Sequence, residues 1–310
     1  PGFEDGEPRP LAAVTGEGGQ AADFVANEVW LVTDDDAELQ AFLTRWNGTV
    51  LKTFDAQAAG LTDVRTQYLV RVDVGANPDP AANLAADLRT LDKHATGDHR
   101  VSSAQGLDLL GVTSHEAVAG LEVGVNWVGS GAGPYLDRTT AEAPTGQALG
   151  GVAYEPNAFN WPSHSATSPQ EIGVGEAWRA LDLAGKLSNR VKLAILDMGF
   201  EPDADTPTGW LAIPNVPLRE PTGTENLLDC GGSECPWHGQ MVLSAAMARA
   251  DNAFGGAGPA GPVADAVIVF TLYDFFTSIT ALGEARIAGA RIANMSYSAP
   301  VPWYLGWSVL

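Results

Sequence analysis

The sequence predicts an α/β protein in which a parallel, doubly wound sheet follows a smaller α+β unit. Two runs, 191–196 (VKLAIL) and 264–270 (ADAVIVF), are almost continuously apolar, which is typical of strands buried on both faces of a parallel sheet. Segments with helical spacing alternate with these runs, and such alternation indicates a parallel sheet. The residues that precede them contain shorter strand candidates and predict a separate α+β unit.

The smaller unit is expected over residues 28–128. Its strands are expected at 28–33, 48–54, 67–74 and 121–128, and its helices at 34–46, 80–91 and 107–119. This order is ferredoxin-like in outline. Residues 1–27 are rich in Gly, Pro, Ala and Glu without sustained periodicity, and we expect them to form a loose leader.

The parallel sheet is expected within residues 166–310. Gly, Pro, Ser and Thr punctuate residues 129–165, which we expect to form a linker between the two units. Besides the two apolar runs, the second unit should contain a strand at 290–296 and helices at 169–181, 239–250 and 275–289. In sheets of this type, functional side chains gather at the carboxyl ends of the strands.

Composition narrows the possible functions. The chain has 38 acidic and 17 basic residues and a net charge of −21, which repels phosphate backbones and argues against binding to nucleic acid. No apolar run approaches the about 18–20 residues of a membrane span, so we expect no membrane partner. The sequence opens with Pro1 and shows no signal-peptide pattern. We therefore expect a secreted or periplasmic protein whose export signal is already absent.

Two side chains stand where catalytic groups are expected in such a sheet. Asp197 follows the apolar run 191–196, and Gly199 permits a sharp exit from the strand. His238 immediately precedes the predicted helix 239–250, and its ordinary pKa near neutrality suits a general base. Each motif alone is weak, because an Asp at a strand end is often a turn former and a His at a helix start is often only packed or solvated.

The strand predicted at 290–296 runs into a polar exit that contains Ser296, Tyr297 and Ser298. An exposed edge at this exit could pair with an extended peptide by β-addition. The alternative is a sheet strand that ends in an ordinary turn.

Five blocks in this order resemble the subtilisin-like (subtilase, S8-type) serine proteases. The Asp block of that family is similar to VKLAILDMGF, its His block to HGQMV, and its Asn/Gly stretch to DNAFGGAGPAGP; the two strands that follow are similar to ADAVIVF and IANMSYSAP. The resemblance covers about residues 169–300. It implies hydrolysis of peptide bonds by an Asp-His-Ser triad.

The resemblance assigns roles to individual residues. Asp197 would orient and electrostatically support His238, and His238 would take the proton from a serine. The strand that pairs with the substrate backbone would be formed by Ser296, Tyr297 and Ser298.

The family's serine block and its oxyanion-hole Asn block are expected well downstream of this strand, and only residues 299–310 follow Ser298. Without a nucleophile the covalent step cannot occur, and loss of the oxyanion donor costs about a further 10²–10³ in rate. We therefore expect the chain to be inactive alone and to need a C-terminal half of the catalytic domain, supplied as a second chain.

The first unit, 28–128, resembles more loosely the propeptides that precede subtilase catalytic domains. Such propeptides template folding and then inhibit the protease as a zymogen, and the linker 129–165 would then contain the maturation site. The alternative is an unrelated accessory domain. The competing function for the whole chain is a non-catalytic pseudoprotease or a propeptide-like module that binds protein segments.

Cys230 and Cys235 form a C-x4-C pair in a Gly-rich loop, and we expect a disulfide there in an oxidising compartment. Free thiols are the alternative. A zinc hydrolase that uses His238 with the two cysteines is a third and weaker hypothesis.

No cofactor is required for the predicted chemistry, although calcium is a lesser possibility. Asp251 and Asn252 lie where family members often have a calcium-binding loop, and oxygen ligands suit calcium. Asp-Asn is also ordinary turn chemistry. Asp203 and Asp205 are expected to be solvated loop acids.

Overall fold

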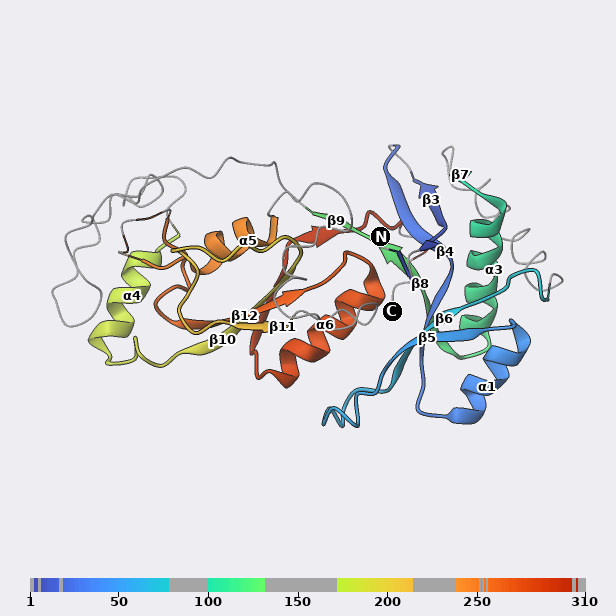
Figure 1. Cartoon of the computed structure of the whole chain (residues 1–310), viewed down its shortest axis with the longest axis horizontal. Coiled ribbons are helices and arrows are strands. Elements are labelled where there is room, and N and C mark those ends of the chain that lie inside the picture. Colours follow the sequence, from blue (N-terminus) through green and yellow to red (C-terminus); the bar gives the residue numbers. More distant parts are fainter. Residues whose placement is uncertain are drawn as a thin grey trace.

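Within the residues that the structure describes, the fold contains a six-stranded antiparallel sheet and a four-stranded parallel sheet, so the predicted mixed α/β class is confirmed (Figure 1). The computed structural model describes residues 3–4, 7–16, 19–77, 100–131, 172–213, 238–250, 252, 254, 256–302 and 305. The predicted helix 80–91, residues 132–165 of the predicted linker, and Cys230, Cys235 and Asp251 lie outside the described residues.

The antiparallel sheet is centred on one long strand. Its members are β3 (Leu11–Thr15), β4 (Ala21–Val32), β5 (Thr49–Phe54), β6 (Gln67–Arg71), β7 (Arg100–Val101) and β8 (Glu122–Val128). The order is β5-β6-β4-β3-β7, and β8 also pairs with β4, with a register shift between Phe24 and Val29. A separate two-stranded ribbon joins β1 (Phe3–Glu4) to β2 (Glu7–Pro8).

The expectation of a loose leader over residues 1–27 is wrong. Strand β3 and the first part of β4 lie within that range and pair with each other in register. Their inward side chains include Ala12, Val14, Ala22 and Phe24, all at most 3% exposed. Three of these four residues are small, so the alternation that marks a half-buried strand is weak in the sequence although the backbone pairing is complete.

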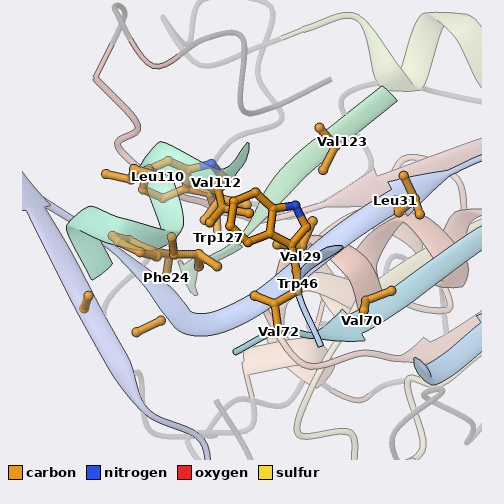
Figure 2. Close-up of a cluster of buried hydrophobic side chains, with 14 of the residues drawn as sticks. Phe24, Val29, Leu31, Trp46, Val70, Val72, Leu110, Val112, Val123 and Trp127 are labelled. Carbon is orange, nitrogen blue, oxygen red and sulfur yellow. The ribbon is translucent and has the colours of Figure 1, made fainter. Parts of the chain in front are cut away.

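Two helices cover one face of this sheet. They are α1 (Asp36–Arg45), capped by the Asp35 carboxylate, and α3 (Ala104–Val118), capped by the Ser103 hydroxyl. The core beneath them contains Phe24, Trp46 and Trp127, and the rings of Phe24 and Trp127 meet edge to face with centroids 5.3 Å apart (Figure 2). These aromatic side chains fix the helices on the sheet.

The parallel sheet has the order β11-β12-β10-β13. Its strands are β10 (Val191–Asp197), β11 (Leu211–Ile213), β12 (Ala264–Phe270) and β13 (Ile292–Met295), and its unit contains the helices α4 (Val174–Leu183), α5 (His238–Met247) and α6 (Phe275–Ile287). Leu196 shares a buried cluster with Ala281 of α6, whereas Ile195 shares one with Leu243 of α5. Both faces of β10 are thus covered, which explains the continuous apolar runs in the sequence.

Helix α6 lies between the two sheets (Figure 1). Phe276 is fully buried in a cluster that also contains Trp30, Val32 and Leu69 from the antiparallel sheet. One face of that sheet is therefore covered by α1 and α3, and the other packs on a helix of the second unit. The two units share an apolar interface.

A buried polar network crosses the same interface. The Arg9 guanidinium donates to Glu28 through two nitrogens, and its Nη1 lies 3.5 Å from Asp274 Oδ2 at the start of α6. The Asn126 amide donates to Glu28 Oε2 (3.0 Å), and its carbonyl oxygen accepts from the Phe276 N–H (3.1 Å). Asp274 also caps α6 by accepting from the Thr277 N–H. The first unit thus supplies part of the cap of α6.

Candidate active site

The structure brings Asp197 and His238 into contact. Asp197 is the last residue of β10 and is fully buried, and His238 is the first residue of α5 and is 7% exposed. The His238 Nδ1 atom lies 2.9 Å from Oδ1 and 3.0 Å from Oδ2 of Asp197. A carboxylate can only accept, so Nδ1 carries the proton and Nε2 is the ring nitrogen that can act as a base.

The loop after β10 fastens the start of α5 to the end of the strand. Gly199 has a φ of 76°, a left-handed conformation that glycine adopts without strain. The Gly239 N–H donates to the Met198 carbonyl (2.8 Å), and the Gln240 N–H donates to the Gly199 carbonyl (3.1 Å). These bonds satisfy two amides that a helix start leaves without an intrahelical partner, and they hold His238 above Asp197.

Close packing at Gly239 predicts an effect of substitution. A Cβ atom there would lie 2.8 Å from the Phe200 ring and 2.9 Å from the Met198 carbonyl oxygen. Gly239→Ala should therefore destabilise the chain by about 1–3 kcal/mol in urea unfolding, because the neighbours must shift.

Gly256→Ala is the matched control, because a Cβ atom at Gly256 meets nothing within 4 Å. Equal unfolding midpoints for the two variants would contradict the close packing of Gly239.

Asp197 has further hydrogen-bond partners beside the histidine. Its Oδ1 accepts from the Met198 N–H (2.8 Å) and from the Tyr273 hydroxyl (2.5 Å), and its main-chain carbonyl accepts from the Thr271 N–H (3.0 Å). Burial and then the charge of Asp197 raise the pKa of the Tyr273 phenol well above its ordinary value. The phenol is therefore a neutral donor at any working pH.

Tyr273 was not predicted from the sequence. It belongs to no motif of the resemblance, but it follows β12 by three residues, and Asp197 pairs in register with Phe270 at the end of that strand. The rule that functional side chains gather at the carboxyl ends of parallel strands would have pointed to it.

Two of the three predicted substrate-pairing residues, Tyr297 and Ser298, lie on a strand that already has a partner. Strand β14 (Tyr297–Ser298) pairs antiparallel with β9 (Ser130–Gly131), which lies in the predicted linker. Ser296 precedes this strand, and its hydroxyl accepts from the Asn294 amide (2.9 Å). The edge predicted to bind a peptide by β-addition thus pairs with an extended segment of the same chain.

The strand pair adjoins the Asp–His contact. The rings of Tyr297 and Tyr273 stack with centroids 4.6 Å apart, and the Tyr297 hydroxyl donates to Ser278 Oγ (3.0 Å). The Gly129 N–H donates to the Tyr273 carbonyl (2.6 Å). The end of the first unit therefore contacts the residues that surround Asp197.

Asp203 and Asp205 are not solvated loop acids, contrary to expectation. Asp205 is 3% exposed and accepts from the Asn252 amide (2.8 Å) and the Gly256 N–H (2.9 Å), while Asp203 is half-buried and accepts from the Thr206 N–H (3.1 Å). The Asn252 carbonyl oxygen accepts from the Phe254 N–H (3.0 Å). Asn252 thus closes a local turn with its side-chain oxygen, while its amide bonds the loop that contains Asp205.

The possible metal sites receive no further support from the described part of the chain. No group of three or more His, Cys, Asp or Glu side chains that could hold a metal ion occurs among the described residues. The other calcium candidate, Asp251, and both cysteines lie outside them. Within the same ranges, no helix is both long and apolar enough to cross a membrane.

Comparison with known proteins shows a weak structural similarity and no sequence match. No protein-family model matches the chain, and no curated protein sequence matches it. A solved structure to which the chain is similar is that of fervidolysin from Fervidobacterium pennivorans, a keratinolytic enzyme related to subtilisin, with a TM-score of 0.47 and 13% sequence identity. The alignment covers 94% of this chain and 38% of the fervidolysin chain, so this chain spans 38% of that protein's length.

Proposed function

We propose that this chain carries the Asp and His of a secreted, subtilisin-like serine endopeptidase, preceded by a propeptide-like unit. The observation that supports this most directly is the contact between the buried Asp197 carboxylate and Nδ1 of His238 at the end of a parallel strand. The order of the five sequence blocks agrees with it. The serine and the oxyanion-hole asparagine come from a segment outside these 310 residues.

The chemistry follows from the orientation of the imidazole. Asp197 holds the tautomer with the proton on Nδ1, so Nε2 of His238 accepts the proton of the serine hydroxyl as the serine oxygen attacks the peptide carbonyl carbon. His238 then gives that proton to the amine that leaves when the peptide C–N bond breaks. Water repeats the sequence on the acyl-enzyme and releases the acid.

The pairing of β9 with β14 supports a peptide as the substrate. Tyr297 lies opposite Gly131 and Ser298 lies opposite Ser130, so the β14 edge accepts an extended backbone. In the proposed protease, residues 130–131 would occupy the place of substrate and the first unit would act as an inhibitory pro-region.

An active-site probe tests the proposal. The intact assembly, produced from the complete reading frame, should react with a fluorophosphonate on the serine-bearing polypeptide. His238→Ala should abolish this labelling, because the serine then has no base. The matched control is His115→Ala, which removes a histidine of α3 in the first unit and should leave labelling unchanged.

Two outcomes would contradict the proposal. Undiminished labelling of His238→Ala would show that this histidine is not the base. Absence of labelling on any polypeptide of the assembly would favour the alternative, a non-catalytic module that binds protein segments through the β14 edge.

A further inference from the structure

The Tyr273 hydroxyl lies 2.5 Å from Asp197 Oδ1 and 3.2 Å from His238 Nδ1. We propose that Tyr273 is a positioning residue of the Asp–His pair: its hydroxyl takes up part of the charge of the Asp197 carboxylate and thereby sets the basicity of His238. The inference rests on the proposed function only in treating His238 as a base. The contacts of the Tyr273 hydroxyl with Asp197 and His238 are observed in the structure.

The surroundings hold Tyr273 in one orientation. Its ring stacks on Tyr297 with an interplanar angle of 24°, and it meets the His238 ring at 79° with centroids 6.3 Å apart. Its main-chain carbonyl accepts from the Gly129 N–H. The raised pKa of the phenol keeps it protonated, so toward Asp197 it acts only as a donor.

The direction of the effect follows from the donors to Asp197. Oδ1 accepts from the Met198 N–H and from Tyr273, and both carboxylate oxygens lie within hydrogen-bond distance of His238 Nδ1. Each donor reduces the negative potential that the carboxylate presents to the imidazole. Removal of the phenol hydroxyl leaves the other two donors to hold Asp197 in place, so a more negative carboxylate faces the ring and favours the imidazolium.

Several titratable groups of the described residues lie around His238. They are Asp197 from β10, Tyr273 from the loop after β12, Tyr297 from β14 and, next to Tyr273, the α6 cap Asp274. Burial raises the pKa of Tyr297, and the charges of Asp197 and Asp274 add to the rise. Of these four groups, Asp197 is the charged one that contacts His238, and Tyr273 modulates that charge.

Side-chain NMR of the full chain tests the inference. The His238 resonance, assigned from its loss in His238→Asn, should titrate with a pKa about 0.5–1 unit higher in Tyr273→Phe than in the unsubstituted chain. Tyr68→Phe, which removes a tyrosine hydroxyl from the antiparallel sheet, is the matched control and should leave the titration of His238 unchanged. An unchanged or lowered His238 pKa in Tyr273→Phe would overturn the proposal.

The outcome of this titration is independent of whether the proposed function is correct. The titration needs only Asp197, His238 and Tyr273, so it requires no nucleophile. A raised pKa in an assembly that no fluorophosphonate labels would support the role of Tyr273 and refute the protease. Labelling by the fluorophosphonate together with an unchanged His238 titration would support the protease and refute the role of Tyr273. In an active assembly, the acidic limb of the pH–rate profile should move upward with the His238 pKa.

Discussion

Asp197→Asn should lower the turnover of a peptide substrate about 10⁴-fold in the assembly from which the inhibitory first unit has been removed. The amide has nearly the shape of the carboxylate, so packing around the fully buried side chain is retained. It can donate to Nδ1 of His238, however, and a donor there selects the tautomer with the proton on Nε2. That tautomer cannot accept the proton of a serine.

Asp265→Asn is the matched control. Asp265 lies on β12 of the same sheet, 46% of its side chain is exposed, and it pairs with Arg190. This variant should keep the turnover of the unsubstituted assembly. Turnover by Asp197→Asn within tenfold of the control would show that Asp197 does not orient the base.

Arg9→Met should destabilise the chain by about 3–5 kcal/mol. The substitution removes the cation that Glu28 and Asp274 share, and both carboxylates are buried, at 0% and 1% exposure. Burial alone would lower the pKa of Arg9, but Asp274 and Glu28 raise it well above its ordinary value, so the guanidinium stays charged. Urea unfolding measures the loss of stability.

Two further variants make this measurement specific. Arg9→Lys keeps the charge but not the paired nitrogens that meet Glu28, so its unfolding midpoint should fall between those of Arg9→Met and the unsubstituted chain. Arg286→Met breaks an exposed ion pair with Asp63 that also links the two units, and it should change the midpoint little. Similar midpoints for Arg9→Met and Arg286→Met would contradict a structural role for the buried network.

The second unit could be predicted well because its strands are buried on both faces. Continuous apolar runs such as 264–270 are visible without knowledge of what packs against them. The contact between Asp197 and His238 was predictable for a related reason. Asp197 ends a strand and His238 begins a helix, and both positions lie at the same edge of a parallel sheet.

The features that the sequence did not reveal depend on contacts between distant residues. Arg9 lies 265 positions before Asp274, and no local pattern links the two. Strand β3 is made largely of small residues whose burial depends on β4 and α3. The Tyr273 hydroxyl becomes a partner of Asp197 only because β12 lies beside β10. Such contacts follow from tertiary packing and leave no periodic signal along the chain.

The short connection between β8 and β9 affects competition for the β14 edge. Gly129 alone separates the two strands, and a Cβ atom there would lie 3.1 Å from the carbonyl oxygens of Tyr273 and Ser298. Because this tether has almost no slack, the effective concentration of residues 130–131 at that edge is in or above the millimolar range. A free peptide that binds the edge with the same intrinsic affinity must be present above that concentration to displace residues 130–131. The edge therefore becomes accessible only after the chain is cut between β8 and β9 or the first unit dissociates.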